Sequence, residues 1–326
     1  MSHMLYADDL CLLANAPDQL QRMLDRLHLY APRKHLVVNT TKSEVVHFNT
    51  NKTSSVPTFR LGPDVLRCAD SFRYLGMHFT RRLNMSAAAD HAVQPFMAAA
   101  QRVRQFVHSH ALLNRPDTVL WLAKTYVVPA GMYGSQIWGT QYLKQSRQFD
   151  SLVQTCHLSF LKGVLGTKRS APNWAMFREC GHEPLRFYWF RAAVKLYNGM
   201  RASNSELLRK VVRADCAFMY RAHHCWTAEL LTALQELEHG QAHCDAVKSG
   251  EELHLSLCCA DLRKQNRSVW DAVDGLNHRE HAEKLVSYHN WTAVPLPASE
   301  SASQRVYPSP LALESHSAAA CYQQCQ

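Results

Sequence analysis

Long hydrophobic runs are missing from this sequence of 326 residues. A membrane-spanning helix needs about 18 or more consecutive apolar residues. The best candidate, the stretch from Val119 to Trp138, is interrupted by Lys124 and Pro129. The first ten residues, MSHMLYADDL, contain no basic segment followed by an apolar one, so no secretory signal is expected. We therefore expect an intracellular protein, cytoplasmic or nuclear, with no membrane partner.

Several nucleotide and hydrolase motifs are missing too. The sequence has no Gly-x-Gly-x-x-Gly, no P-loop and no Gly-x-Ser-x-Gly, so dinucleotide binding, P-loop hydrolysis and serine hydrolysis have no support. Charged residues make up 19% and hydrophobic residues 47%, which excludes wholesale disorder and allows about two domains. The eleven cysteines are odd in number and scattered, which favours free thiols over a disulfide framework.

Acidic residues are scarce in the middle of the chain. Residues 81–200 contain 15 basic and 5 acidic side chains, whereas residues 1–80 contain 9 and 7, and residues 201–326 contain 12 and 15. Because phosphate affinity rises with the number of Lys and Arg contacts, this excess predicts a polyanion partner. A solvated helical surface is the alternative. The candidate phosphate-binding residues are Arg102, Arg104, Lys124, Lys162, Lys168 and Arg169.

The first eighty residues predict the β-rich part of an α+β fold. A hairpin is expected around Asp8-Asp9, because a short apolar run lies on each side of this turn-forming pair. A helix is expected to begin at Pro17, with Leu20, Met23, Leu24 and Leu27 on one apolar face. Further strands are expected at 36–38, 44–48, 58–61, 65–68 and 72–79, with a turn at 49–55.

From Ser86 onward the pattern predicts long helices. Apolar residues recur at helical spacing in two stripes, Phe96-Ala99-Ala100-Val103-Phe106-Val107 and Phe149-Leu152-Cys156-Phe160. Pro116 is expected to begin a helix, Gly181 to end one, and Ser203 to Glu206 to form a capping box. The Pro- and Ser-rich segment that follows Pro295 predicts a disordered tail.

Two adjacent carboxylates stand at the first expected hairpin, in the sequence Tyr6-Ala7-Asp8-Asp9. A tight turn holds such a pair at the rim of a sheet, where it suits a divalent metal ion that contacts phosphate oxygens. Aspartate is also common at turns for a local reason, since its side chain accepts hydrogen bonds from nearby backbone amides. A solvated turn is therefore the alternative interpretation.

The order of the motifs resembles that of reverse transcriptases of non-LTR (LINE-type) retrotransposons. Tyr6-Ala7-Asp8-Asp9 is similar to their YADD box, and Asn39-Thr40-Thr41-Lys42-Ser43 and Phe72-Arg73-Tyr74-Leu75-Gly76 resemble the segments that follow it. Further matching segments, in the same order, are Tyr133 to Trp138, Leu165-Gly166-Thr167, Glu179-Cys180-Gly181 and Pro184-Leu185. The resemblance covers about residues 4–240.

The resemblance implies roles for particular residues. It makes Asp8 a ligand of catalytic Mg²⁺, Asp9 a support of the same metal cluster, and Lys42 the proton donor to the leaving pyrophosphate. The residues that it places near the nucleotide and the primer end are Tyr6, Tyr74, Leu75 and Gly76. The implied partners are an RNA template and a DNA primer, and the oligomeric state stays open. Tyr133 and Trp138 are interpreted as core residues.

The implied domains are a partial palm (1–82), a helical thumb-like region (83–240), a C-terminal helical extension (241–294) and the tail (295–326). The family has a further metal-binding aspartate on a strand well upstream of the YADD box. The few residues that precede Tyr6 in this sequence leave no room for that strand. Since two-metal catalysis needs ligands from both places, we expect a polymerase fragment that is inactive alone. The alternatives are a non-catalytic basic helical module that binds nucleic acid, and a structural remnant that binds nothing.

Histidine and cysteine pairs raise the possibility of zinc. His239-x₃-His243 and Cys321-x₃-Cys325 have ligand-like spacing, but about eighty residues separate them. The second pair resembles the first half of a C-terminal zinc knuckle. Histidines satisfied by protein contacts are the preferred interpretation.

Overall fold

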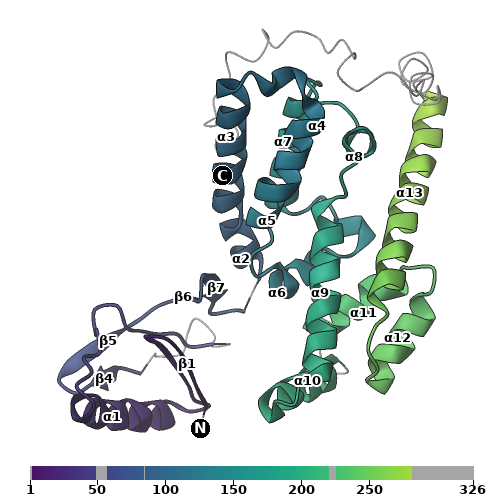
Figure 1. The fold of residues 1–326 in the computed structure, drawn as a ribbon. Coiled ribbons are helices and arrows are strands. Elements are labelled where there is room, and N and C mark those ends of the chain that lie inside the picture. Colours follow the sequence, from purple (N-terminus) through teal and green to yellow (C-terminus); the bar gives the residue numbers. More distant parts are fainter. Residues whose placement is uncertain (1, 49–56, 84, 220–224, 281–326) are drawn as a thin grey trace. The chain divides into compact units, whose positions relative to one another are not determined.

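The computed structural model describes residues 2–48, 57–83, 85–219 and 225–280, and it confirms the α+β class (Figure 1). The chain divides into two compact units, residues 1–88 and 89–326. The expected turn at 49–55, the expected tail and the Cys321/Cys325 pair lie outside the described residues.

The N-terminal unit begins with the expected hairpin. Strand β1 (Ser2–Tyr6) pairs antiparallel with β2 (Asp9–Leu13), and Tyr6 stands opposite Asp9. Helix α1 (Pro17–Arg33) follows, with proline in its first turn. A small core forms where α1 faces the next strands, and Leu24, Phe59 and Leu66 are buried in it.

A three-stranded sheet contributes the rest of that core. Its order is β3 (Glu44–Val45), β5 (Asp64–Cys68) and β4 (Phe59–Leu61), parallel between β3 and β5 and antiparallel between β5 and β4. The strand expected at 44–48 therefore shortens to two residues. The strand expected at 36–38 is wrong, because these residues find no partner strand and Val37 is 96% exposed.

The segment expected as one strand at 72–79 is instead a second hairpin. Strand β6 (Ser71–Tyr74) pairs with β7 (Met77–Thr80). The residues between them, Leu75 and Gly76, have φ angles of 47° and 79°. Positive φ at both central residues is the backbone of a type I′ turn, whose twist matches that of paired strands.

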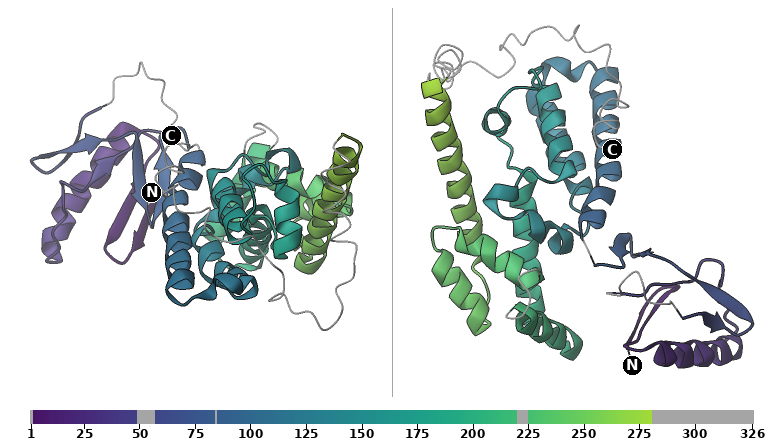
Figure 2. Two further views of the ribbon diagram at one scale, coloured as in Figure 1. Left: turned by 90° about the horizontal axis from the view of Figure 1, so that it is seen from above. Right: turned by 180° about the vertical axis from the view of Figure 1, so that it is seen from behind.

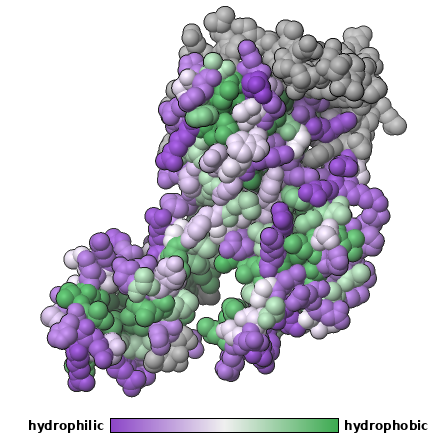
Figure 3. Space-filling model, in the orientation of Figure 1, coloured by the Kyte–Doolittle hydropathy of each residue, from purple (hydrophilic) through white to green (hydrophobic). Residues whose placement is uncertain are grey.

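Apolar side chains remain on the surface of the N-terminal unit (Figure 3). Leu5 and Tyr6 of the first hairpin are 67% and 64% exposed, and Leu36 after α1 is 57% exposed. Leu12, on β2, packs against the core instead. The first hairpin thus buries only part of its apolar surface within the described residues.

Helices build the second unit. It contains α3 (Val93–Ser109), α4 (Pro116–Leu122), the π-helix η2 (Ala123–Val127), α5 (Val128–Ala130), α6 (Ser135–Trp138), α7 (Leu152–Val164), α8 (Asn173–Cys180), α9 (Leu185–Ala202), α10 (Glu206–Met219), α11 (Trp226–Gln235), α12 (Gly240–Ser249) and α13 (Leu255–Glu280). α2 (Ser86–His91) precedes them, and the 3₁₀ turns are η1 (Leu112–Asn114), η3 (Gly139–Tyr142) and η4 (Gln145–Arg147). Helix α9 runs through the middle and packs against α6, η3 and α13 (Figures 1 and 2).

The predicted helix ends are partly confirmed. Pro116 begins α4, and Gly181, with a φ angle of 56°, ends α8. The cap of α10 differs from the prediction, because the Ser205 hydroxyl accepts the bond from the backbone N–H of Leu208 at 3.4 Å. The Ser203 hydroxyl accepts from the backbone N–H of Ser205 instead.

Most residues of the two predicted apolar stripes are buried or partly buried, and the exceptions are Phe106 and Phe149. Phe106 is 45% exposed and stacks on His110, with 4.1 Å between ring centroids. Phe149 precedes α7 and is 36% exposed. Trp138 is buried as expected, whereas Tyr133 is 61% exposed.

Two histidines are buried in this core and make stability depend on pH. His157 is fully buried, and its ring centroid lies 6.0 Å from that of Phe96 and 5.8 Å from that of His182. Burial and the neighbouring His182 lower the pKa of His157 to about 3. Burial and Lys124 lower the pKa of His182 to about 4, although its ring bonds to the Leu120 carbonyl.

We therefore expect the unfolding free energy to fall as the pH drops below 6.5, the ordinary histidine pKa. Below this pH the unfolded chain binds protons on both histidines, whereas the folded chain binds them only near pH 3 at His157 and near pH 4 at His182. Each histidine therefore lowers the unfolding free energy by about 1.4 kcal/mol per pH unit. Urea unfolding between about pH 7 and pH 5 measures this. His157→Leu should flatten the dependence, and an unchanged slope in that variant would contradict the assignment.

No helix in the described ranges is both long and apolar enough to cross a membrane.

Candidate functional site

The acidic pair lies at the tip of the first hairpin, with Asp8 in the turn and Asp9 at the start of β2. Ala7 adopts a left-handed conformation, with a φ angle of 51°, and Asp8 and Asp9 are both exposed. The hairpin thus holds two adjacent carboxylates in solvent, one in its turn and one at the start of β2. This geometry presents acidic oxygens to a cation or to a cation-bearing ligand.

The fit of these residues to Mg²⁺ is incomplete. Mg²⁺ takes near-octahedral oxygen ligands, which come from one or two carboxylates, waters and substrate phosphates. Within the described residues, Asp8 and Asp9 belong to no set of three metal-ligand atoms within 4.8 Å of one another. The turn therefore offers two carboxylates of such a site and no third protein ligand.

Lys42 lies in a turn built by Asn39. The Asn39 side-chain oxygen accepts hydrogen bonds from the Lys42 backbone N–H at 3.1 Å and from the Thr41 hydroxyl at 2.7 Å. The Ser43 hydroxyl donates to the Asn39 carbonyl at 2.8 Å. This pattern is the turn that asparagine favours, and it explains the Asn-x-x-Lys-Ser spacing locally. The Lys42 side chain is exposed.

The third predicted segment lies at the turn between β6 and β7. Tyr74 is half-buried at the end of β6, and Leu75 is 37% exposed in the turn. Gly76 supplies the second left-handed residue of that turn. The predicted polymerase residues of the N-terminal unit thus lie at three separate turns: Tyr6, Asp8 and Asp9 at the first hairpin, Lys42 in the Asn39 turn, and Tyr74, Leu75 and Gly76 at the turn between β6 and β7.

The six candidate phosphate-binding residues have different surroundings. Arg102 and Arg104 are exposed on α3, and Lys168 and Arg169 are exposed between α7 and α8. The Arg104 guanidinium also lies 5.3 Å from the centroid of the Phe160 ring. These four side chains present positive charge to solvent.

The two remaining lysines hold the helical unit together. The Lys124 ammonium donates to the Gly181 carbonyl at 3.0 Å, where α8 ends. The Lys162 ammonium donates to the Arg169 carbonyl at 2.7 Å and to the Asn173 side chain at 3.0 Å. Burial lowers the pKa of Lys162. No local sequence signal distinguishes these lysines, because their acceptors lie 7 to 57 residues away.

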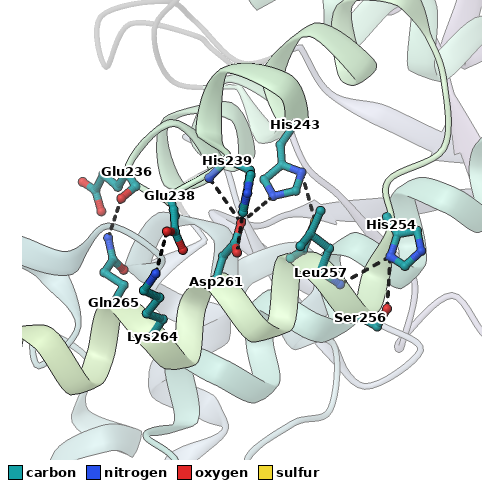
Figure 4. Close-up of polar contacts among 11 residues, drawn as sticks. Glu236, Glu238, His239, His243, His254, Ser256, Leu257, Asp261, Lys264 and Gln265 are labelled. Carbon is teal, nitrogen blue, oxygen red and sulfur yellow. Dashed lines mark hydrogen bonds and ion pairs between the residues drawn. The ribbon is translucent and has the colours of Figure 1, made fainter.

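A second polar cluster joins α12 to α13 (Figure 4). His243 Nε2 lies 2.9 Å and His239 Nδ1 lies 3.1 Å from the Asp261 carboxylate. The Cys258 sulfur lies 3.6 Å from the other ring nitrogen of His243. Burial of Asp261 raises its pKa, but the bonds from His243 and His239 outweigh this and hold the pKa below its ordinary range.

This cluster is a candidate metal centre by composition. Ligand atoms of Glu238, His239 and Asp261 lie within 4.8 Å of one another. However, Lys264 already pairs with Glu238 at 2.5 Å, and both histidines already pair with Asp261 (Figure 4). Burial raises the pKa of the Cys258 thiol to about 12, so this thiol stays protonated at neutral pH. The cluster works as a satisfied helix-to-helix contact.

Comparisons with known proteins find distant similarity. The chain is 27% identical over 140 residues to the RNA-directed DNA polymerase from mobile element jockey of Drosophila melanogaster, which covers 41% of this chain and 15% of that protein. It is 25% identical over 203 residues to the retrovirus-related Pol polyprotein from type-1 retrotransposable element R1 3 of Nasonia vitripennis, covering 58% and 53%. The matches thus span at most about half of these relatives. No family model and no solved structure matches the chain.

This weak homology supports a relation to the reverse transcriptase family of retrotransposons. Proteins of that family act on nucleic acid.

Proposed function

We propose that this chain is part of a non-LTR retrotransposon reverse transcriptase and that it binds a primed template. The observation that carries the proposal is the hairpin at Tyr6-Ala7-Asp8-Asp9, which holds two exposed carboxylates at its tip. In the complete polymerase, Asp8 and Asp9 are metal ligands and Mg²⁺ is the metal, whose chemistry is to neutralise charge on the phosphates.

The other predicted residues complete this proposal. Lys42 is the proton donor to the leaving pyrophosphate, since a positioned ammonium suits that task. Tyr6, Tyr74, Leu75 and Gly76 lie near the nucleotide and the primer end. Arg102, Arg104, Lys168 and Arg169 bind phosphates, whereas Lys124 and Lys162 act mainly through the contacts that position α8 and the loop before it.

The chain alone is proposed to be inactive as a polymerase. The support is the ligand set, because the described residues place no third protein ligand beside Asp8 and Asp9. Two-metal phosphoryl transfer clamps both the attacking and the leaving oxygen, which two neighbouring carboxylates do not achieve.

Binding and primer extension with a recessed RNA–DNA template–primer test this proposal. Four phosphate contacts predict an affinity that falls about 100-fold between about 50 and 200 mM salt. No nucleotide should be incorporated, and Asp8→Asn should leave binding unchanged. Template-dependent incorporation that Asp8→Asn abolishes would overturn the inactivity, and a chain that binds nothing at low salt would overturn the binding.

The alternative is a non-catalytic basic module that binds nucleic acid through its helices. The observation that favours it is the charge, since residues 81–200 hold 15 basic and 5 acidic side chains. Competition between a recessed template–primer and a blunt duplex of the same sequence separates the two functions. Preference for the recessed end supports the polymerase fragment, and equal binding supports the module.

A further inference from the structure

Two large aromatic side chains are exposed close together along the chain. Trp121 at the end of α4 is 59% exposed, and Tyr126 in the π-helix η2 is 57% exposed. Exposed rings of this size leave much apolar area in water, so their position on the helix needs a physical reason.

The helical pattern predicts a buried Tyr126. Val119 and Leu122 face the core, and Tyr126 follows them by seven and four residues. In a regular α-helix, these spacings place all three side chains on one face. Tyr126 would then point into the unit rather than into solvent.

The π-helix changes which residue faces the core. A π turn bonds residues five apart instead of four, so it inserts one residue into the helix. Val127 accordingly takes the buried position, with no exposed area, and Tyr126 turns outward. The Thr125 hydroxyl donates to the Trp121 carbonyl at 2.9 Å and ties the turn together. Single π turns are rare and occur frequently at functional sites.

The segment that carries the two rings is polar and basic. Besides Trp121 and Tyr126, the exposed residues between 114 and 126 are Asn114, Arg115, Asp117, Lys124 and Thr125. The only acidic residue of the segment 93–127 is Asp117, whose carboxylate lies 3.5 Å from Arg115.

Helix α3, which packs against η2, is also basic. It carries Arg102 and Arg104 and no acidic residue. Unpaired bases offer apolar faces on a charged backbone, so they match rings that stand among polar and cationic groups. An apolar protein surface would match such a mixed surface less well.

We propose that Trp121 and Tyr126 form a stacking platform for the bases of single-stranded nucleic acid. This inference rests on the proposed function. It specifies that this part of the helical unit binds single-stranded nucleic acid. The bases stack on the two rings, and the arginines of α3 attract the phosphates.

Fluorescence anisotropy with the full chain tests the platform, using a labelled 12-nucleotide single strand and a blunt duplex of the same sequence. Base stacking predicts that the Trp121→Ala/Tyr126→Ala double variant binds the single strand about 10- to 100-fold more weakly. Its duplex binding should not change. The Trp121→Phe/Tyr126→Phe variant keeps two rings and should retain most of the affinity. Tyr30→Ala is the matched control, because Tyr30 is 53% exposed on α1 in the other unit.

The outcomes separate this inference from the proposed function. A double variant that binds the single strand as tightly as the natural chain would overturn the platform and leave the proposed function standing. A natural chain that binds only the duplex would do the same. A natural chain that binds neither would overturn the proposed function itself. Unchanged circular dichroism and melting temperature in each variant show that the fold is intact.

Discussion

Replacing Arg186 by alanine is expected to lower the unfolding free energy by about 3–5 kcal/mol. Arg186 lies on α9 and is 1% exposed. Its guanidinium donates to the Leu143 carbonyl at 2.5 Å and to the Gln265 side chain at 2.9 Å, and it lies 3.7 Å from the Glu236 carboxylate. Burial lowers its pKa to about 10, with Glu236 partly opposing the shift, so it is charged at neutral pH.

The effect is large because one side chain ties three other parts of the helical unit to α9. Its removal leaves a buried carbonyl and a partly buried carboxylate without their cation. Chemical denaturation of the full chain measures the loss. Arg186→Lys keeps the charge but not the planar fork of donors, so it should fall between the natural chain and Arg186→Ala. An alanine variant as stable as the natural chain would contradict this role.

Replacing Trp189 by alanine is expected to cost about 3–5 kcal/mol as well, for a different reason. Trp189 is fully buried on α9, and its ring centroid lies 5.1 Å from that of Trp138 and 6.0 Å from that of Tyr142. Its indole N–H donates to the Gly131 carbonyl at 3.3 Å. The smaller side chain leaves a cavity where two other aromatic rings meet.

Thermal and urea unfolding of the variant measure the cost of this cavity. Trp121→Ala is the matched control, because it removes the same atoms from a side chain that is 59% exposed. It should change the unfolding free energy by less than about 0.5 kcal/mol. Equal losses in the two variants would contradict the assignment of Trp189 to the core.

Local structure was predictable wherever neighbouring residues decide it. The first hairpin follows from turn chemistry between two apolar runs, although its turn is Ala7-Asp8 rather than Asp8-Asp9. Pro116 and Gly181 mark helix ends because their backbone preferences act within one turn. The Asn39 turn that carries Lys42 is local for the same reason.

Other features of the structure depend on a partner that is distant in the sequence. Residues 36–38 have strand-like side chains, but a strand exists only where another strand supplies the hydrogen bonds. The hydrogen bonds of Lys124 and Lys162 depend on carbonyls that the fold brings to them. The pairing of His239 and His243 with Asp261 joins two helices and has no local signal.

The opposite case is Tyr126, where a regular pattern predicts burial and the π turn reverses it. The amino-acid sequence was therefore sufficient for the α+β class, the acidic turn and the basic middle segment, all of which depend on composition or short-range preference. The exposed aromatic pair, the structural lysines and the buried histidines needed the packed chain. Their environments depend on how the chain packs, because packing decides which side chains are buried and which charged groups lie beside them.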